Sequence, residues 1–499
     1  MLRQVRPIAI VKAPQMKISE ENWDNFMLLN GMLATAADMS FQNYVEVLST
    51  ASEELGSLGN IFSRIRSLAI RWHVDTQTLL QRLLVTIKVK RISDFFARLA
   101  RTLRTGTSLI DFLKMESSTH QLSEQRAVER AEERYRLLTD AYSSLLSSFL
   151  FLFITLVITS VVFGFGDLNH IILTIVCFPA ACAIVMLLAR RVLPSYDLIR
   201  PRARIIIRYR ILITLLIIAT VLLPFVVFLL NLPPEVAFLT LIPLGLIAFI
   251  AYNVGKKIIN IVNHIDEELP LFISSLADIT ASTGSIIESI SVLVAGRWRW
   301  FMNSLRRLKA QLDVGANFER CWRLFKLELL SRLAWNSLGL FVVGVRTGLD
   351  PDRFSEVLIR SIDLKVHARR IRSAVASYAR GLIVPIHCAF VGVTLMLMLI
   401  LDAFGRLTEA AVGVTSFVLL PFFITPVTTM TTFIFIITFM VSVIFIIVNS
   451  LFMGLLEGGS PFPILRALAY LLLATGVVGF LTTVGVRYLI EVMGVFGGG

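Results

Sequence analysis

The stretch ERAEERYR at residues 129–136, followed by LLSSFLFLFITLVITSVVF at residues 145–163, decides the fold class of this chain. The first stretch mixes acids and bases, as a solvated helix does, whereas the second is an apolar run close to the ~20 residues that cross a bilayer. The whole chain is 56% hydrophobic and 17% charged, with a mean hydropathy of +0.76. Charged and apolar residues must be segregated, which predicts an all-α polytopic membrane protein with sizeable water-exposed domains.

Further apolar runs of similar length predict seven transmembrane helices in total. These lie at residues 145–163, 171–189, 211–230, 236–254, 382–401, 432–451 and 467–486. Residues 410–427 are also apolar, but Pro421 and Pro426 interrupt them. This segment is predicted to be re-entrant or to lie on the outer surface, with an eighth span as the alternative.

The distribution of Lys and Arg predicts the orientation. The loop at 190–210 is dense in arginine, whereas the turns at 164–170 and 231–235 contain neither Lys nor Arg. Because cytoplasmic loops retain positive charge, segments 1–140 and 255–380 are predicted to be cytoplasmic, together with the N-terminus. The chain is therefore expected to be a multi-pass protein of the cell membrane.

A repeated tripeptide suggests an internal duplication. Arg104-Thr105-Gly106 and Arg346-Thr347-Gly348 each close a basic helical stretch, and each precedes a helix with apolar residues at i, i+3 and i+4. The predicted organisation is a tail (1–21), a first cytoplasmic helical module (22–140), four transmembrane helices (141–254) around the basic loop at 190–210, a second helical module (255–380), and three or four transmembrane helices (381–499).

Proline and glycine predict the helix limits in the two modules. Pro270, preceded by two glutamates, is expected to begin a helix, since its missing N–H costs nothing in the first turn. Gly284, Gly315 and Gly348 are expected to end helices in the second module, and Gly106 does so in the first. Helices separated by single glycines predict a compact antiparallel bundle.

Some of these residues carry a resemblance to a known family. The pattern Glu-Leu-Pro-x-Phe at 268–272, followed by Leu276, Gly284, Gly315 and Gly348, resembles the cytoplasmic domain of the type II secretion system F family, the platform proteins of type IV pilus machines. Four spans between the modules, and Leu-Leu-Glu-Gly-Gly at 455–459, are similar to its archaeal branch. The first module departs from the pattern, because it has no Glu-Leu-Pro opening.

The resemblance implies a role without enzymatic activity. A protein of this kind is expected to be the membrane platform of an archaellum or adhesion pilus, and to couple a hexameric secretion ATPase to the insertion of pilin-like or archaellin-like subunits. Membrane lipid is a further expected partner, and a homodimer is possible. No cofactor is expected.

A basic run in the second module is the predicted docking surface for the ATPase. It consists of Arg297, Trp298, Arg299, Arg306, Arg307 and Lys309. Arginine and tryptophan are the residue types that most often dominate an interface. The alternatives are that these side chains contact lipid headgroups or are simply solvated. The arginines at 369, 370, 372 and 380, which precede a span, are predicted to be topology anchors.

The sequence lacks the motifs of several kinds of chemical site. There is no Gly-x-x-x-x-Gly-Lys-Ser/Thr phosphate loop, so no ATP hydrolysis is expected. The four cysteines are too scattered for a zinc cluster or a disulfide framework, and no metal site is predicted. His387, inside a span, is either a proton-relay residue or, as favoured, a hydrogen-bonded residue of the bundle.

The net charge of +13 has three possible origins. Positive-inside bias and attraction to anionic lipid account for most of it, and an acidic protein partner is the alternative. Nucleic acid is not an expected partner, because no nucleic-acid-binding motif accompanies the charge.

Two other function classes compete with the platform. A secondary transporter with internal repeats is the main alternative, but transporters usually carry ionisable groups near mid-membrane, and these spans are almost free of them. A membrane enzyme would need a convergent acid, base or metal group at the membrane face, and none is visible.

Overall fold

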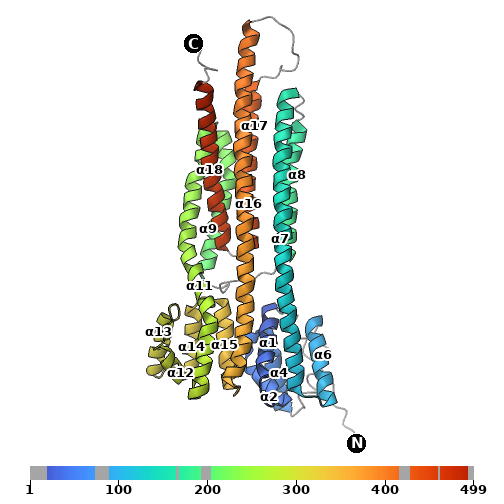
Figure 1. Ribbon diagram of the computed structural model, residues 1–499, viewed down its shortest axis with the longest axis vertical. Coiled ribbons are helices and arrows are strands. Elements are labelled where there is room, and N and C mark those ends of the chain that lie inside the picture. Colours follow the sequence, from blue (N-terminus) through green and yellow to red (C-terminus); the bar gives the residue numbers. More distant parts are fainter. Residues whose placement is uncertain are drawn as a thin grey trace. The chain divides into compact units, whose positions relative to one another are not determined.

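The computed structural model describes residues 20–72, 89–163, 168–192, 204–414, 427–458 and 461–492, and within these ranges every regular element is a helix (Figure 1). The chain divides into two compact units. Unit 1 comprises Met1–Val128 and Ile261–His367, and unit 2 comprises Glu129–Asn260 and Ala368–Gly499. Helices α7 (Leu109–Phe163), α11 (Leu241–Thr283) and α16 (Pro351–Val414) contribute residues to both.

Unit 1 takes short helices from two distant parts of the chain. From the N-terminal part come α1 (Glu20–Leu33), α2 (Phe41–Thr50), α3 (Ser52–Leu55), α4 (Ser57–Trp72) and α6 (Lys90–Thr105). From the later part come α12 (Ile286–Leu293), α13 (Met302–Asp313), α14 (Phe318–Glu328) and α15 (Arg332–Arg346). Side chains at the start of several helices accept hydrogen bonds from backbone N–H groups that have no partner inside the helix. Ser331, for example, caps Ala334 at 3.0 Å.

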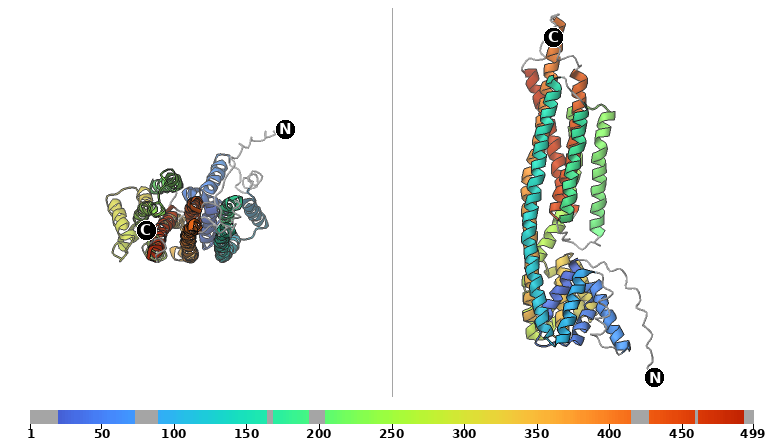
Figure 2. Two further views of the ribbon diagram at one scale, coloured as in Figure 1. Left: turned by 90° about the horizontal axis from the view of Figure 1, so that it is seen from above. Right: turned by 90° about the vertical axis from the view of Figure 1, so that its right-hand side faces the viewer.

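One hydrophobic core joins both parts of unit 1. Phe26, Phe62 and Phe96 pack edge to face or stacked in the N-terminal part, and Phe272 stacks on Phe301 in the later part. All of them belong to a single continuous cluster. Helix α1 also packs against α15, so that the N-terminal helices and the later ones lie side by side (Figure 2). The two predicted modules therefore share one core, while their origin by duplication stays a prediction.

Ion pairs connect the same two parts. Lys326 Nζ lies 3.2 Å from Glu54 Oε1, and the two side chains are only 4% and 8% exposed. Next to this pair, Arg323 contacts Glu53 at 3.5 Å on the surface. Glu21 accepts hydrogen bonds from Arg332 and from Asn336. Burial alone would raise the pKa of Glu21, but these two donors outweigh it, and the pKa is lowered.

Unit 2 contains the remaining helices. They are α8 (Leu168–Val192), α9 (Arg204–Leu229), α10 (Pro234–Leu239), α17 (Val427–Leu456) and α18 (Pro461–Val492). Helices α17 and α18 are neighbours, and α9 packs on both. The core of unit 2 is mainly apolar, with a buried hydrogen bond of 2.6 Å from the Tyr142 hydroxyl to Asn449.

Six helices of the described residues are long and apolar enough to cross a membrane. They overlap six of the seven predicted spans; the other, at 171–189, falls in α8, where many side chains are outside the described residues. The segment at 410–427 is mostly outside them as well. The predicted span at 236–254 is divided at Thr240 between α10 and α11, where Pro243 fits the first turn of α11.

The prediction that a helix begins at Pro270 is wrong. Pro270 lies inside α11, which runs without interruption to Thr283. An interior proline removes one backbone hydrogen bond, but Leu269, Phe272 and Ile273 around it are all buried. The apolar area that these side chains bury offsets the lost bond, so packing overrides the local preference of the proline.

The four glycines predicted to end helices all take left-handed backbone conformations. The φ angles are +70° at Gly106, +71° at Gly284, +81° at Gly315 and +74° at Gly348. A Cβ at any of them would meet no atom within 4 Å. The requirement for glycine is therefore conformational, not a matter of space.

We expect Gly348→Ala to destabilise unit 1 by about 1 kcal/mol, because alanine disfavours this φ. Gly381→Ala is the control: Gly381 lies inside α16 in open space with ordinary helical φ, so alanine there is expected to be neutral or stabilising. Thermal unfolding of the full chain in detergent distinguishes the two, and equal shifts in both variants would contradict the argument.

Candidate docking surface

The predicted docking residues lie on the loop at 294–301 and on the helix that follows it, α13. Arg297 and Arg299 come from the loop and Arg306 and Arg307 from α13, and all four are exposed. Lys309 is half-buried. The structure thus places these cations on consecutive parts of one surface segment of unit 1.

A glutamate on α11 fixes the conformation of this loop. The carboxylate of Glu268 accepts hydrogen bonds from the backbone N–H of Arg299 at 3.2 Å and of Trp300 at 3.1 Å. The Trp300 ring also stacks on His264 of the same helix, with ring centroids 4.8 Å apart. A charged acceptor for two backbone donors is a strong local restraint. The arginines are consequently held by α11.

The tryptophans face inward. Trp298 donates from Nε1 to the Leu293 carbonyl oxygen at 2.9 Å, and its ring packs edge to face on Phe272 at 5.3 Å. Both Trp298 and Trp300 are half-buried. They anchor the loop to the core of unit 1. The side chains that this loop exposes to a partner are therefore those of its arginines.

The cations differ in whether an acid neutralises them. Arg307 pairs with Glu328 at 3.2 Å, and Lys309 pairs with Asp313 at 3.3 Å. Arg297, Arg299 and Arg306 have no ion pair with any residue that the structure describes; Arg299 lies over the Trp300 ring. We call these three residues the basic patch. Their charge is free to meet an acidic partner, and docking itself stays a prediction.

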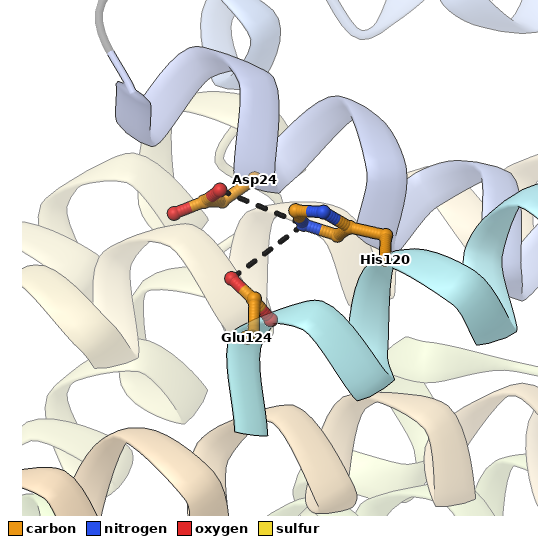
Figure 3. A group of neighbouring side chains, drawn as sticks. All are labelled: Asp24, His120 and Glu124. Atoms are coloured by element: carbon orange, nitrogen blue, oxygen red, sulfur yellow. Dashed lines mark ion pairs between the residues drawn. The ribbon is translucent and has the colours of Figure 1, made fainter. Parts of the chain in front are cut away.

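A second polar group lies elsewhere in unit 1. His120 on α7 is buried, with only 8% of its side chain exposed. Its Nε2 faces Asp24 Oδ1 of α1 at 3.6 Å and Glu124 Oε1 at 3.5 Å (Figure 3). Arg91 Nη2 approaches the other ring nitrogen at 3.4 Å. Sequence reasoning missed this group, because no spacing along the chain relates Asp24 to His120.

The three ligand atoms of Asp24, His120 and Glu124 lie within 4.8 Å of one another and are of the types that zinc takes. The prediction that the chain has no metal site therefore stays open to test. Arg91 and Lys365 both bring positive charge to Glu124 and lower its pKa, in addition to His120. With cations already opposite its carboxylates, the group works as an ion-pair cluster between α1 and α7.

The cluster predicts a pH dependence. Burial lowers the pKa of His120, but Asp24 and Glu124 outweigh it, so the folded pKa is raised above the ordinary value of about 6.5. The contribution to stability is then fully present below that ordinary pKa and is lost as the pH rises through the folded value. We expect the difference in thermal midpoint between the wild type and His120→Gln to shrink from pH 6 to pH 9.

The matched control for this prediction is His367→Gln, which removes an exposed histidine of the same unit. Because this side chain is exposed, its removal should change the thermal midpoint little. The burial of Glu124 raises its pKa, but its cationic neighbours lower it overall, so its contribution is lost only in acid, outside the window. A constant difference for His120→Gln would contradict the assignment.

Three other kinds of side chain considered in the sequence analysis are His387, the cysteines and Arg380. His387 lies 2.8 Å from the Thr475 hydroxyl, which confirms that it is hydrogen-bonded within the bundle. The four cysteines are free thiols. Arg380, predicted to be a topology anchor, forms an ion pair with Glu457, a partner that sequence reasoning did not identify.

The chain is similar to Flagella accessory protein J of the archaeon Methanocaldococcus jannaschii, with 22% identity over 349 residues, which are 67% of this chain. The match spans 61% of that protein, less than two thirds of its length. No family model matches the chain, and no solved structure matches it. The identity and length of the match establish distant homology.

Proposed function

We propose that this chain, as a distant homologue of an archaeal flagella accessory protein, is an integral membrane platform for assembly of a type IV pilus-like filament, an archaellum or an adhesion pilus. In this role it couples a cytoplasmic secretion ATPase to the insertion of pilin-like subunits and has no enzymatic activity of its own. The similarity over 349 residues is the observation that carries the proposal.

The structure supports a docking role for unit 1 in this proposal. Its short helices form a separate compact unit, and it carries the basic patch, whose three arginines have no acidic partner among the described residues. Unpaired surface charge of one sign steers association with a surface of the opposite sign. We therefore assign the basic patch to an acidic surface of the ATPase.

The direct test is a binding measurement. The full chain in lipid nanodiscs is titrated with the purified secretion ATPase of its own organism at moderate salt. We expect the triple variant Arg297→Glu, Arg299→Glu and Arg306→Glu to bind the ATPase about tenfold or more weakly, since each reversal replaces attraction by repulsion. The same variant should assemble few or no filaments while remaining in the membrane.

The full chain is needed because residues 255–380 alone would expose the core that they share with the N-terminal helices. The matched control reverses three arginines of unit 1 that already have acidic partners: Arg353 and Arg360, which are exposed, and Arg66, which is half-buried. Both variants change the net charge equally. Equal losses of binding would remove the assignment of the basic patch, whereas a wild-type chain that fails to bind the ATPase would overturn the proposed coupling.

A further inference from the structure

Two arginines in unit 2 share one carboxylate. Arg380 of α16 and Arg466 of α18 both donate to the same oxygen, Oε1 of Glu457, which lies in the turn between α17 and α18. The three side chains are 20%, 22% and 14% exposed. We call this group the Arg-Glu-Arg triad. It is mostly buried, yet it carries one positive charge more than it has negative charges.

That excess charge lacks an internal partner. The Arg466 Nε atom is buried and has no hydrogen-bond partner among the described residues. The Arg466 guanidinium lies over the Tyr252 ring, with 5.8 Å to its centroid, and Arg380 also donates to the Ser377 hydroxyl at 2.6 Å. Neither contact supplies negative charge. Two guanidinium groups on one carboxylate oxygen repel each other, and a half-buried charge of this kind is costly unless an anion neutralises it.

The position of the triad indicates where such an anion comes from. Glu457 separates two helices that are each long and apolar enough to cross a membrane, and Arg380 directly precedes the apolar run at 382–401. Residues at the ends of spans lie at the level of the lipid headgroups. A third arginine, Arg372, places its guanidinium against Gly458 in the same turn. Basic pockets between transmembrane helices are typical sites for acidic headgroups.

We propose that the Arg-Glu-Arg triad binds the phosphodiester group of an anionic phospholipid. A phosphodiester carries one negative charge, which neutralises the single excess charge of the triad. Its oxygens accept hydrogen bonds from guanidinium groups in the fork geometry that arginine favours. A zwitterionic lipid brings its own cation and restores the excess, so the site selects anionic lipid.

The experiment is native mass spectrometry of the full chain in detergent, titrated with phosphatidylglycerol. Phosphatidylcholine and inorganic phosphate serve as the comparison ligands. We expect phosphatidylglycerol to bind about tenfold more tightly than phosphatidylcholine, and inorganic phosphate at the same concentration to leave that binding unchanged. Equal affinity for the two lipids would overturn the proposal. Displacement by inorganic phosphate would also overturn it, since the site would then be one for a free anion.

Variants test the residues. Arg466→Gln and Arg380→Gln should each weaken phosphatidylglycerol binding about tenfold. Glu457→Gln should strengthen it, because the site then carries two excess charges, and a purely structural triad predicts no such gain. The control is Arg487→Gln at the other end of α18, where Arg487 pairs one to one with Glu235. No change in the triad variants, or an equal loss in the control, would contradict the assignment. The comparison of the two lipids on the wild type decides the case if a variant fails to fold.

Discussion

Lys326→Met is expected to lower the free energy of unfolding of unit 1 by about 3–5 kcal/mol, the usual cost of breaking a buried ion pair by removing one partner. The variant leaves the Glu54 carboxylate, which is only 8% exposed, without its cation. The Lys326 ammonium also lies 4.3 Å from the centroid of the Trp335 ring, a contact that methionine keeps only in part.

Tryptophan fluorescence measures this effect selectively, since all six tryptophans of the chain belong to unit 1. Denaturant unfolding of the full chain in detergent then follows unit 1 alone. The double variant Lys326→Met with Glu54→Gln should recover most of the loss, because no charge is left buried.

The neighbouring surface pair is a matched control. Arg323 and Glu53 are 62% and 47% exposed, so Arg323→Met should cost no more than about 1 kcal/mol. Equal losses of unfolding free energy for Arg323→Met and Lys326→Met would show that burial does not determine how much the ion pair between Glu54 and Lys326 contributes to stability.

Phe272→Ala is the second large effect, with an expected loss of about 3–5 kcal/mol from the same unit. The ring is 1% exposed, stacks on Phe301 at 4.4 Å and supports Trp298. Its removal leaves a cavity beneath the loop that carries Arg297 and Arg299. Affinity for the ATPase should fall together with stability, whereas charge reversal of the basic patch should reduce affinity and leave stability unchanged.

The control for this prediction is the adjacent position on α11. Leu271 is 64% exposed, so Leu271→Ala should change the free energy of unfolding by less than about 0.5 kcal/mol. A variant at 272 that unfolds normally, or that binds the ATPase with wild-type affinity despite lost stability, would show that the core does not position the loop.

Local patterns predicted the features that depend on neighbouring residues. Six of the predicted spans overlap long apolar helices, and the glycines at 106, 284, 315 and 348 take positive φ at helix ends. The prediction of a helix start at Pro270 was wrong because it used neighbouring residues alone. A proline after two glutamates matches a helix start, but buried side chains on both sides of it keep α11 continuous.

The amino-acid sequence by itself determined the segregation of charge from apolar spans, the helical class and the helix ends, because each depends on composition or on a few adjacent residues. Only the tertiary structure decided which groups meet. Glu54 and Lys326 are 272 residues apart, and the Arg-Glu-Arg triad joins α16 and α18 through the turn that precedes α18. It also decided that the tryptophans beside the basic patch face inward. Such contacts are selected by burial, since a charge or ring removed from water needs a partner wherever the fold can bring one.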